Sequence, residues 1–245
     1  MEIDPTSHLP LYAQVQAVLA SSITSGSLAL GARLPSEDSL VERFGVSRTT
    51  VRKTIQNLVD TGLLEIRRGK GTFVAQPKIT QELTQLTGFV EDMEAVGRNP
   101  TARLLGKQIV AASQTVARAL AIRMGTLVVR IERVRLADGV PVSFDETYLP
   151  RAIGEKVMES DLEREPIFSL LEHKLNTPLV EAEYRLEAVA AESAVAEVLG
   201  ISAGSPIFLI ERTTYSAHRQ PVDYEKLHYR GDQIRFVTHL TRRGG

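Results

Sequence analysis

The sequence contains no cysteine, and none of its apolar runs approaches the length of a membrane span. A chain without cysteine cannot form a disulfide scaffold, a thiolate zinc site or a cysteine nucleophile. A membrane-spanning helix needs about 20 consecutive apolar residues, so we expect none here. The first residues are acidic and carry no hydrophobic segment, which argues against a secretory signal. These absences predict a soluble, cytoplasmic protein.

The chain also has little net charge, −1 over 245 residues, but its charges are distributed unevenly. Between Arg43 and Gly71 seven basic residues are opposed only by Asp60 and Glu65, which gives a net charge of +5 over 29 residues. Such a local excess is typical of a surface that binds nucleic acid. Taken alone, it is also consistent with the solvated face of a helix.

The first 76 residues have the pattern of a helix-turn-helix followed by a hairpin. Apolar residues recur at helical spacing in three segments. Ser36 and Ser47 stand where N-caps are expected, and Gly62 stands where a helix ends. Two short strand-like runs then flank a basic, glycine-rich tip. The expected elements are helices over 10–25, 37–44 and 48–61 and strands over 63–66 and 72–74. This order predicts a winged helix-turn-helix domain over residues 1–76.

In such a domain the second helix of the pair enters the major groove with its N-terminal turns. Those turns carry Ser47, Arg48, Thr49 and Arg52, on the side away from the apolar stripe. Arginine can read guanine through two hydrogen bonds, while serine and threonine suit phosphates or thymine methyl groups. The hairpin tip at 67–71 adds three cations, and its glycines let the backbone approach DNA. Exposed helix arginines and a tight turn explain each residue singly; the order and spacing together favour DNA binding.

Residues 77–85 are polar without a visible buried face, and we predict that they form a linker. The segment 86–243 is richer in strand signals, including a hairpin turn at Ala137-Asp138-Gly139. About six mostly antiparallel strands with surrounding helices predict an α+β domain. Five scattered histidines without metal-ligand spacing indicate no metal site.

Two features of this second segment suggest an anionic ligand. Arg133 and Arg135 alternate along a strand and therefore share one face, where guanidinium groups need anions. Thr87-Gly88-Phe89 opens a helix whose free N–H groups can bind phosphate. Taken alone, the arginines are explained by salt bridges to Glu132, Asp145 or Glu225, and the helix start by an ordinary cap.

The first segment resembles the GntR family of bacterial transcription regulators. The resemblance implies DNA contacts at the matching positions, which are Ser47, Arg48, Thr49, Thr50, Arg52, Arg68, Lys70 and Gly71. It differs at Asp38, where many members carry an arginine that touches DNA. The motifs that carry the resemblance are Pro10-Leu11-Tyr12-Ala13-Gln14-Val15, Leu34-Pro35-Ser36-Glu37, the run 44–52, Leu58-Val59-Asp60-Thr61-Gly62-Leu63-Leu64 and the run 67–74.

The second segment resembles the HutC branch of that family, whose effector-sensing UTRA domain is related in fold to chorismate lyase. The motifs that carry this resemblance are the runs 86–93 and 131–142, Tyr148-Leu149-Pro150, the run 220–224 and Tyr229-Arg230-Gly231-Asp232. In sugar-phosphate-sensing members the helix start and two strand arginines hold the phosphate, while acids and a tyrosine hold hydroxyls. The matching positions are Thr87, Gly88, Phe89, Arg133, Arg135, Asp145, Asp223 and Tyr229, and Ser169 at a helix start is a further candidate. Asp145 and Asp223 stand where glutamate is common, which implies a wider pocket or a shifted ligand.

The resemblance implies a homodimeric, ligand-responsive repressor that binds a near-palindromic double-stranded operator and is released by a small anionic metabolite. It implies no cofactor and no membrane partner. A constitutive DNA binder with a vestigial sensor domain is the alternative. An enzyme is not expected, because the sequence lacks a phosphate-binding loop, a nucleophile elbow and a zinc-protease helix. Residual lyase-like catalysis would rest on shared fold alone.

Overall fold

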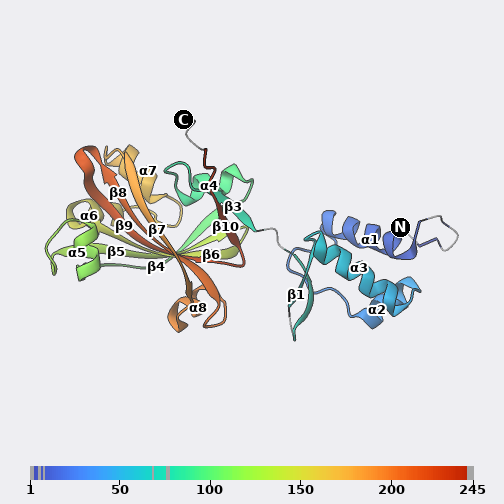
Figure 1. Cartoon of the computed structure of the whole chain (residues 1–245). Coiled ribbons are helices and arrows are strands. Elements are labelled where there is room, and N and C mark those ends of the chain that lie inside the picture. Colours follow the sequence, from blue (N-terminus) through green and yellow to red (C-terminus); the bar gives the residue numbers. More distant parts are fainter. Residues whose placement is uncertain (1–2, 5–6, 8, 68, 76–77, 242–245) are drawn as a thin grey trace. The chain divides into compact units, whose positions relative to one another are not determined.

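The computed structural model describes residues 3–4, 7, 9–67, 69–75 and 78–241 (Figure 1). The chain divides into two compact units, Met1–Pro77 and Lys78–Gly245, each with its own hydrophobic core. The expected domain limits at residues 76, 77 and 243 lie outside the described residues. Among the described residues, no helix has the length and apolar character to cross a membrane.

The first unit consists of three helices and a two-stranded antiparallel hairpin. Ser36 caps the second helix by accepting a hydrogen bond from the backbone N–H of Ser39 at 3.2 Å. Gly45 ends that helix in the left-handed conformation, with φ of 62°, which a glycine adopts without strain. The sequence predicts all five elements within a few residues. Their bounds are α1 Leu11–Thr24, α2 Glu37–Phe44, α3 Arg48–Asp60, β1 Leu64–Arg67 and β2 Gly71–Val74.

Apolar side chains from every element of the first unit meet in one core. Leu40 of α2 and Leu58 of α3 are fully buried, and Val74 of β2 closes the core from the hairpin side. Burying one face of α3 in this way turns its opposite, polar face toward solvent. The remaining buried members are Val15, Leu19, Ile23, Leu34, Val46, Val51, Ile55 and Leu64.

The second unit is built on a six-stranded antiparallel sheet, so the predicted α+β class is confirmed. The strand order is β4-β5-β6-β9-β8-β7. Residues that alternate along a strand lie on opposite faces of the sheet, and one face carries most of the charged side chains discussed below. The bounds are β4 Pro100–Ala111, β5 Leu127–Ala137, β6 Val140–Pro150, β7 Glu181–Ala190, β8 Pro206–Ser216 and β9 Gln220–Arg230.

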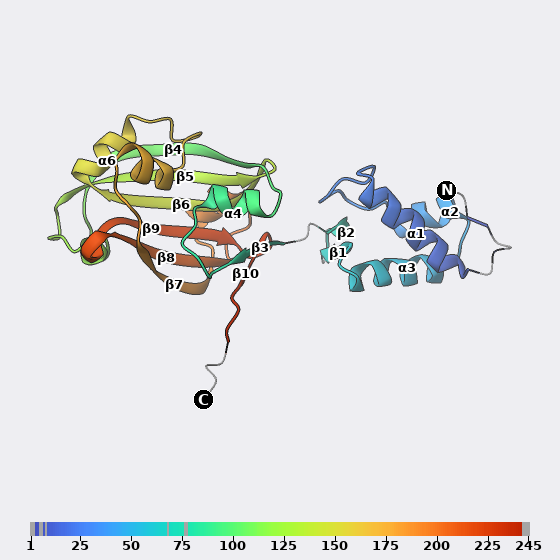
Figure 2. The same cartoon turned by 90° about the horizontal axis from the view of Figure 1, so that it is seen from above.

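Helices cover both faces of this sheet. Figure 1 shows α4 and α7 on one side and α8 on the other, and Figure 2 shows α4 and α6 lying over the strands. Helix α7 continues into a π-helical turn, Leu170–Lys174. The bounds are α4 Phe89–Ala95, α5 Gln114–Ala119, α6 Arg151–Met158, α7 Ile167–Ser169 and α8 Ser193–Leu199.

Helix α6 is absent from the sequence-based expectations. It follows β6 directly and contains Gly154, which lowers its apparent helical tendency. The structure explains this glycine: a Cβ there would lie 2.5 Å from the Cβ of Val129 on β5. The close approach of α6 to the sheet therefore requires glycine at this position.

The prediction of a linker over 77–85 is wrong for the four residues that form a strand. Residues Ile79–Glu82 form β3, which pairs in parallel with β10, Ile234–Val237, near the other end of the unit. Ile79 and Gln81 are buried in this pair. A four-residue strand with a single aliphatic side chain has too little apolar alternation to be recognised, and its partner lies far away in the sequence.

Candidate functional site

The N-terminal turns of α3 present a polar surface that the local sequence dictates. Ser47 caps the helix by accepting from the backbone N–H of Thr50 at 3.1 Å, and the two hydroxyl groups lie 2.9 Å apart. Arg48, Thr49 and Arg52 are exposed on the face opposite the buried side chains. The first unit therefore brings these predicted residues together on one solvent-facing surface.

Both arginines of this surface are paired with acids at the start of α2. The Nε of Arg52 lies 2.9 Å from Oε2 of Glu37, and an Nη of Arg48 contacts a carboxylate oxygen of Asp38. All four side chains are exposed by more than a third, and ion pairs of this kind contribute about 0–1 kcal/mol. The guanidinium groups therefore remain available to a partner.

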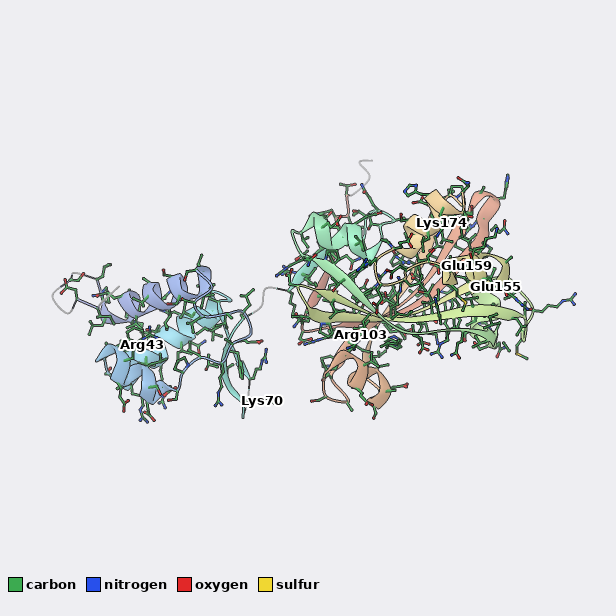
Figure 3. The ribbon with its side chains drawn as sticks, turned by 180° about the vertical axis from the view of Figure 1, so that it is seen from behind. Arg43, Lys70, Arg103, Glu155, Glu159 and Lys174 are labelled. Carbon is green, nitrogen blue, oxygen red and sulfur yellow. The ribbon has the colours of Figure 1, made fainter. Side chains whose placement is uncertain are left out.

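The hairpin forms the expected basic wing. Arg67 pairs with Gly71 across the strands, and the backbone N–H of Lys70 donates to the carbonyl of Arg67 at 2.9 Å. Lys70 is exposed near the tip (Figure 3) and has no acid partner within the described residues. Arg68, also predicted to contact DNA, lies outside the described residues. Gly71 has φ of 118°, and a Cβ there would lie 3.0 Å from the Nε of Arg33.

An open groove of about 720 Å³ runs between α2, α3 and the wing. Arg33 lines it and makes no ion pair with the described residues, so it adds an uncommitted cation beside the wing. Arg33 is not among the residues predicted to contact DNA, because it precedes the basic stretch that begins at Arg43. The lining residues are Arg33, Leu34, Pro35, Ser36, Glu37, Ser39, Ile55, Gly71 and Thr72.

In the second unit, strand register gathers charged side chains on the sheet face beneath α4 and α7. Arg133 of β5 lies opposite Asp145 of β6, and Glu225 of β9 lies opposite Arg212 of β8. All four are at least nine-tenths buried. A buried charge must be paired or hydrogen-bonded to be tolerated. A buried group whose partners are incomplete therefore indicates where this site can bind a ligand.

Three buried arginines lie on this face, and two of them, Arg135 and Arg212, form ion pairs with acids. The Nε of Arg135 lies 3.1 Å from Oδ2 of Asp145. The Nε of Arg212 donates to Oε2 of Glu225 at 2.8 Å, and its Nη1 donates to the hydroxyl of Tyr184 at 2.9 Å. Of the salt bridges considered for Arg133 and Arg135 from the sequence, the one between Arg135 and Asp145 forms, and Arg133 makes none with the described residues.

Arg133 is the exception. It is 0% exposed, and its only hydrogen bond to a described residue joins Nη1 to the carbonyl of Leu162 at 3.5 Å. Its Nε and Nη2 have no partner in the described part of the chain. Burial, followed by repulsion from Arg135, lowers its pKa to about 9. Buried donors without acceptors are rare in native proteins, so this guanidinium calls for an acceptor that the described residues do not supply.

A buried acid nearby is also incompletely satisfied. Among the described residues, Oδ1 of Asp223 has no partner, while its Oδ2 accepts only a long bond, 3.4 Å, from the hydroxyl of Thr214. Burial and repulsion from Glu225 raise the pKa of Asp223 well above its usual range. The site therefore offers unused donors and an unused acceptor under the same covering helices.

The space among these groups is small. The pocket encloses about 20 Å³, room for about one water molecule. A metabolite can enter only if the cover moves outward, and that cover includes the start of α4 and the segment at Phe168. The lining residues are Gly88, Phe89, Asp92, Arg133, Arg135, Asp145, Pro166, Ile167, Phe168, Arg212, Glu225, Leu227 and Tyr229.

The start of α4 is already capped internally. The backbone N–H of Gly88 donates to Glu91 at 3.3 Å, and the hydroxyl of Thr87 donates to Asp92 at 2.6 Å. The carbonyl of Thr87 accepts from Arg212 at 3.3 Å. The ordinary cap considered from the sequence is therefore present, and a ligand would have to share or displace it.

Most of the predicted ligand-contacting residues line the pocket, but not all do. Ser169 is exposed and points away, because its neighbours Phe168 and Leu170 take the buried positions of this turn. Thr87 and Asp223 lie beside the lining rather than in it. Sequence reasoning missed Arg212 as a site residue. The signal that could have identified Arg212 is its spacing from Ile210 and Thr214, which places the three residues on one face of the strand.

Comparison with known proteins gives two family matches, one in each unit of the chain. Residues 11–74 match bacterial regulatory proteins of the gntR family, and residues 95–235 match the UTRA domain. The chain is 36% identical over 242 residues to the HTH-type transcriptional repressor NagR of Bacillus subtilis, covering 99% of each chain. It is 34% identical over 226 residues to the histidine utilization repressor of Pseudomonas putida, covering 92% of this chain and 90% of the repressor.

A solved structure agrees with these matches. The crystal structure of PhnF from Mycobacterium smegmatis is similar, with a TM-score of 0.68 and 27% identity, covering 94% of this chain and 100% of PhnF. The similarity extends over both units of the chain, so the order of a helical unit followed by a sheet unit is shared.

Proposed function

The chain belongs to the GntR family of bacterial regulatory proteins, in the branch with a UTRA domain, and we propose that it is a repressor released from its operator by a small anionic metabolite. The family consists of transcription regulators, so the chain is a DNA-binding regulator and not an enzyme. In this proposal the first unit binds DNA, and the second unit binds the metabolite and dimerises.

The surface of α3 and the wing supports the DNA-binding part. Arg48 and Arg52 stand on the exposed N-terminal turns of α3, where a groove-reading helix contacts base edges. Lys70 and Arg33 flank the groove between α3 and the wing and suit phosphates. Two copies would place one winged helix on each half-site of a near-palindromic operator, because symmetric dimers bind symmetric sites.

The single observation that carries the ligand-binding part is the buried, half-satisfied Arg133. Two of its donors lack acceptors at 0% exposure, and a phosphate or carboxylate would supply them in forked geometry. Asp223 adds an unused acceptor for a hydroxyl or amine on the same molecule. This pairing of chemistries favours a polyhydroxylated anion such as a sugar phosphate.

Release requires that the metabolite bind one arrangement of the protein more tightly than the other. The small pocket gives a physical route. A ligand larger than about one water cannot fit in 20 Å³, so binding would displace the start of α4 and the Phe168 segment. The covered arrangement would then be the one that binds DNA.

A thermal-shift screen tests the proposal. The purified chain would be melted with sugar phosphates, urocanate, fatty acids and dicarboxylates, with inorganic phosphate as a further probe. A saturable rise in Tm for one anionic class is expected, since a ligand of the folded state stabilises it by mass action. A melting curve unchanged by every anion, from a chain that still binds DNA, would favour the constitutive DNA binder.

A further inference from the structure

The two arginines on the N-terminal turns of α3 each form an ion pair with an acid of α2, but through different nitrogen atoms. Glu37 contacts Arg52 through Nε, and Asp38 contacts Arg48 through an Nη group. Neither contact is forced by burial, because Arg48 is 58% and Asp38 69% exposed. Other cations of this unit are left without acids among the described residues: Lys53 lies over the ring of Tyr12, and Lys70 is exposed at the wing.

The carboxylate of Asp38 beside Arg48 affects the contacts of Arg48 with phosphates and with bases unequally. A phosphate that approaches Arg48 also approaches the exposed carboxylate of Asp38, and the two anions repel each other. A guanine edge is uncharged and meets no such repulsion. A guanidinium has five N–H donors, so a contact with one nitrogen leaves enough donors to read a base.

The acid also restricts where Arg48 can go. An unpaired arginine has many rotamers and can reach any nearby phosphate, which gives affinity without sequence information. A carboxylate that holds one edge of the guanidinium keeps the remaining donors in one region beside α3. A phosphate that draws Arg48 away from Asp38 must break this ion pair, which weakens binding to that phosphate by less than about tenfold, because exposed ion pairs are weak.

We propose that Asp38 is a specificity-determining residue that reserves Arg48 for base reading and keeps it from the phosphates of non-operator DNA. This inference rests on the proposed function of the first unit as the DNA-binding domain. Asp38 lies on a surface that binds a polyanion. Its role there is to discriminate between DNA sequences rather than to add affinity for DNA.

The test compares two neutralised acids on the same helix. The preferred duplex is first selected from a randomised 24-base-pair library with the unaltered full-length chain. Asp38→Asn removes the acid that contacts Arg48. Glu42→Gln removes an acid of α2 that is exposed and makes no ion pair with the described residues, so it is the matched control for charge alone.

For Asp38→Asn we expect binding to random duplex to tighten by about 3- to 10-fold at 0.1 M salt, because Arg48 gains a phosphate. Its salt dependence on random duplex should steepen by about one in log–log slope. Affinity for the selected duplex should change less than about threefold, so that the specificity ratio falls. Glu42→Gln should leave the ratio unchanged.

Two outcomes would overturn the inference: an unchanged ratio in Asp38→Asn, or an equal change in Glu42→Gln. In an Arg48→Ala background the effect of Asp38→Asn should largely disappear; its persistence would show direct repulsion of DNA and would also overturn the role assigned to the contact. If the unaltered chain selects no duplex, the proposed function itself fails, which is a distinct result.

Discussion

Arg135 of β5 reaches diagonally to Asp145 of β6, two residues beyond its register partner Ser143, and its Nε lies 3.1 Å from Oδ2 of the aspartate. Ser143 donates to the other oxygen of Asp145 at 2.6 Å. The pocket thus supplies its own anion for one arginine while leaving Arg133 without one. A ligand anion would first accept hydrogen bonds from the unpaired nitrogens of Arg133. It could then compete with Asp145 for Arg135.

Arg135→Ala should leave operator binding intact and abolish the response to the ligand, because the replacement removes one half of the proposed anion fork. DNA binding by fluorescence anisotropy, with and without the metabolite identified by thermal shift, measures both. Arg130→Ala is the control, since Arg130 lies on the same strand but pairs with Glu132 and Glu146.

Because Arg135→Ala also leaves Asp145 buried without its cation, the double replacement Arg135→Ala/Asp145→Asn is measured alongside. A normal ligand response in either folded variant would remove Arg135 from the pocket.

Arg52→Ala should weaken binding to the selected duplex by about 1–3 kcal/mol and relax the preference at one base pair. Titration of matched and singly substituted duplexes measures both effects. Arg43→Ala on α2 is the control (Figure 3), since Arg43 lies over the ring of Phe44 and not on the predicted reading surface. Equal losses in the two variants would mean that only general charge is being measured.

Lys70→Ala should weaken selected and random duplexes alike, because a lysine at the wing suits phosphate and carries no base information. The log–log dependence of affinity on salt should become shallower by about one unit. The comparison of the two duplexes in a salt titration provides the check. A selective loss on the selected duplex would instead assign Lys70 to a base.

Arg212→Met should destabilise the second unit by about 3–5 kcal/mol, because it leaves Glu225 buried without its cation. Arg212→Met/Glu225→Leu should recover much of that loss. Chemical denaturation of the full chain measures the free energy of unfolding. The exposed pair Arg151 and Glu155 provides the comparison, since breaking it should change stability by about 0.3–0.5 kcal/mol.

Asp223→Asn should change how stability depends on pH. Burial raises the pKa of Asp223 above its ordinary 3.8, so the folded chain holds this proton more tightly than the unfolded chain does. The stabilisation is present below pH 3.8 and is lost as pH rises through the raised pKa. The asparagine variant does not lose this stabilisation as pH rises. Its free energy of unfolding, relative to that of the unaltered chain, should therefore increase with pH. Denaturant midpoints from pH 4 to pH 8 check this, and a difference that falls with pH would contradict it.

The sequence was most informative where structure is local. The caps at Ser36 and Ser47 and the alternation of Arg133 and Arg135 depend on residues within a few positions of each other. The winged helix and the shared face of the two arginines followed from them directly. The same reasoning placed Asp38 on α2 but could not pair it with Arg48, because that contact depends on how two helices cross.

Contacts between distant strands were not accessible in this way. Arg212 meets Glu225 because β8 and β9 pair in one particular register, which a shift of one residue would destroy. The strand β3 depends on β10, more than 150 residues away. Ser169 was chosen for its place at a helix start, but the direction of its side chain is set by the burial of its neighbours.

The parallel pairing of β3 with β10 has a mechanical consequence. Lys78 leads directly into β3, and its ammonium group donates to the carbonyl of Gly231 at 2.6 Å. The backbone N–H of Ile79 donates to Gln233 at 2.8 Å, and that of Leu83 donates to Val237 at 2.9 Å. A pull along β3 from Lys78 loads these bonds together in shear instead of opening them one after another like a zipper. A force directed along the strand would therefore be shared by all of these hydrogen bonds.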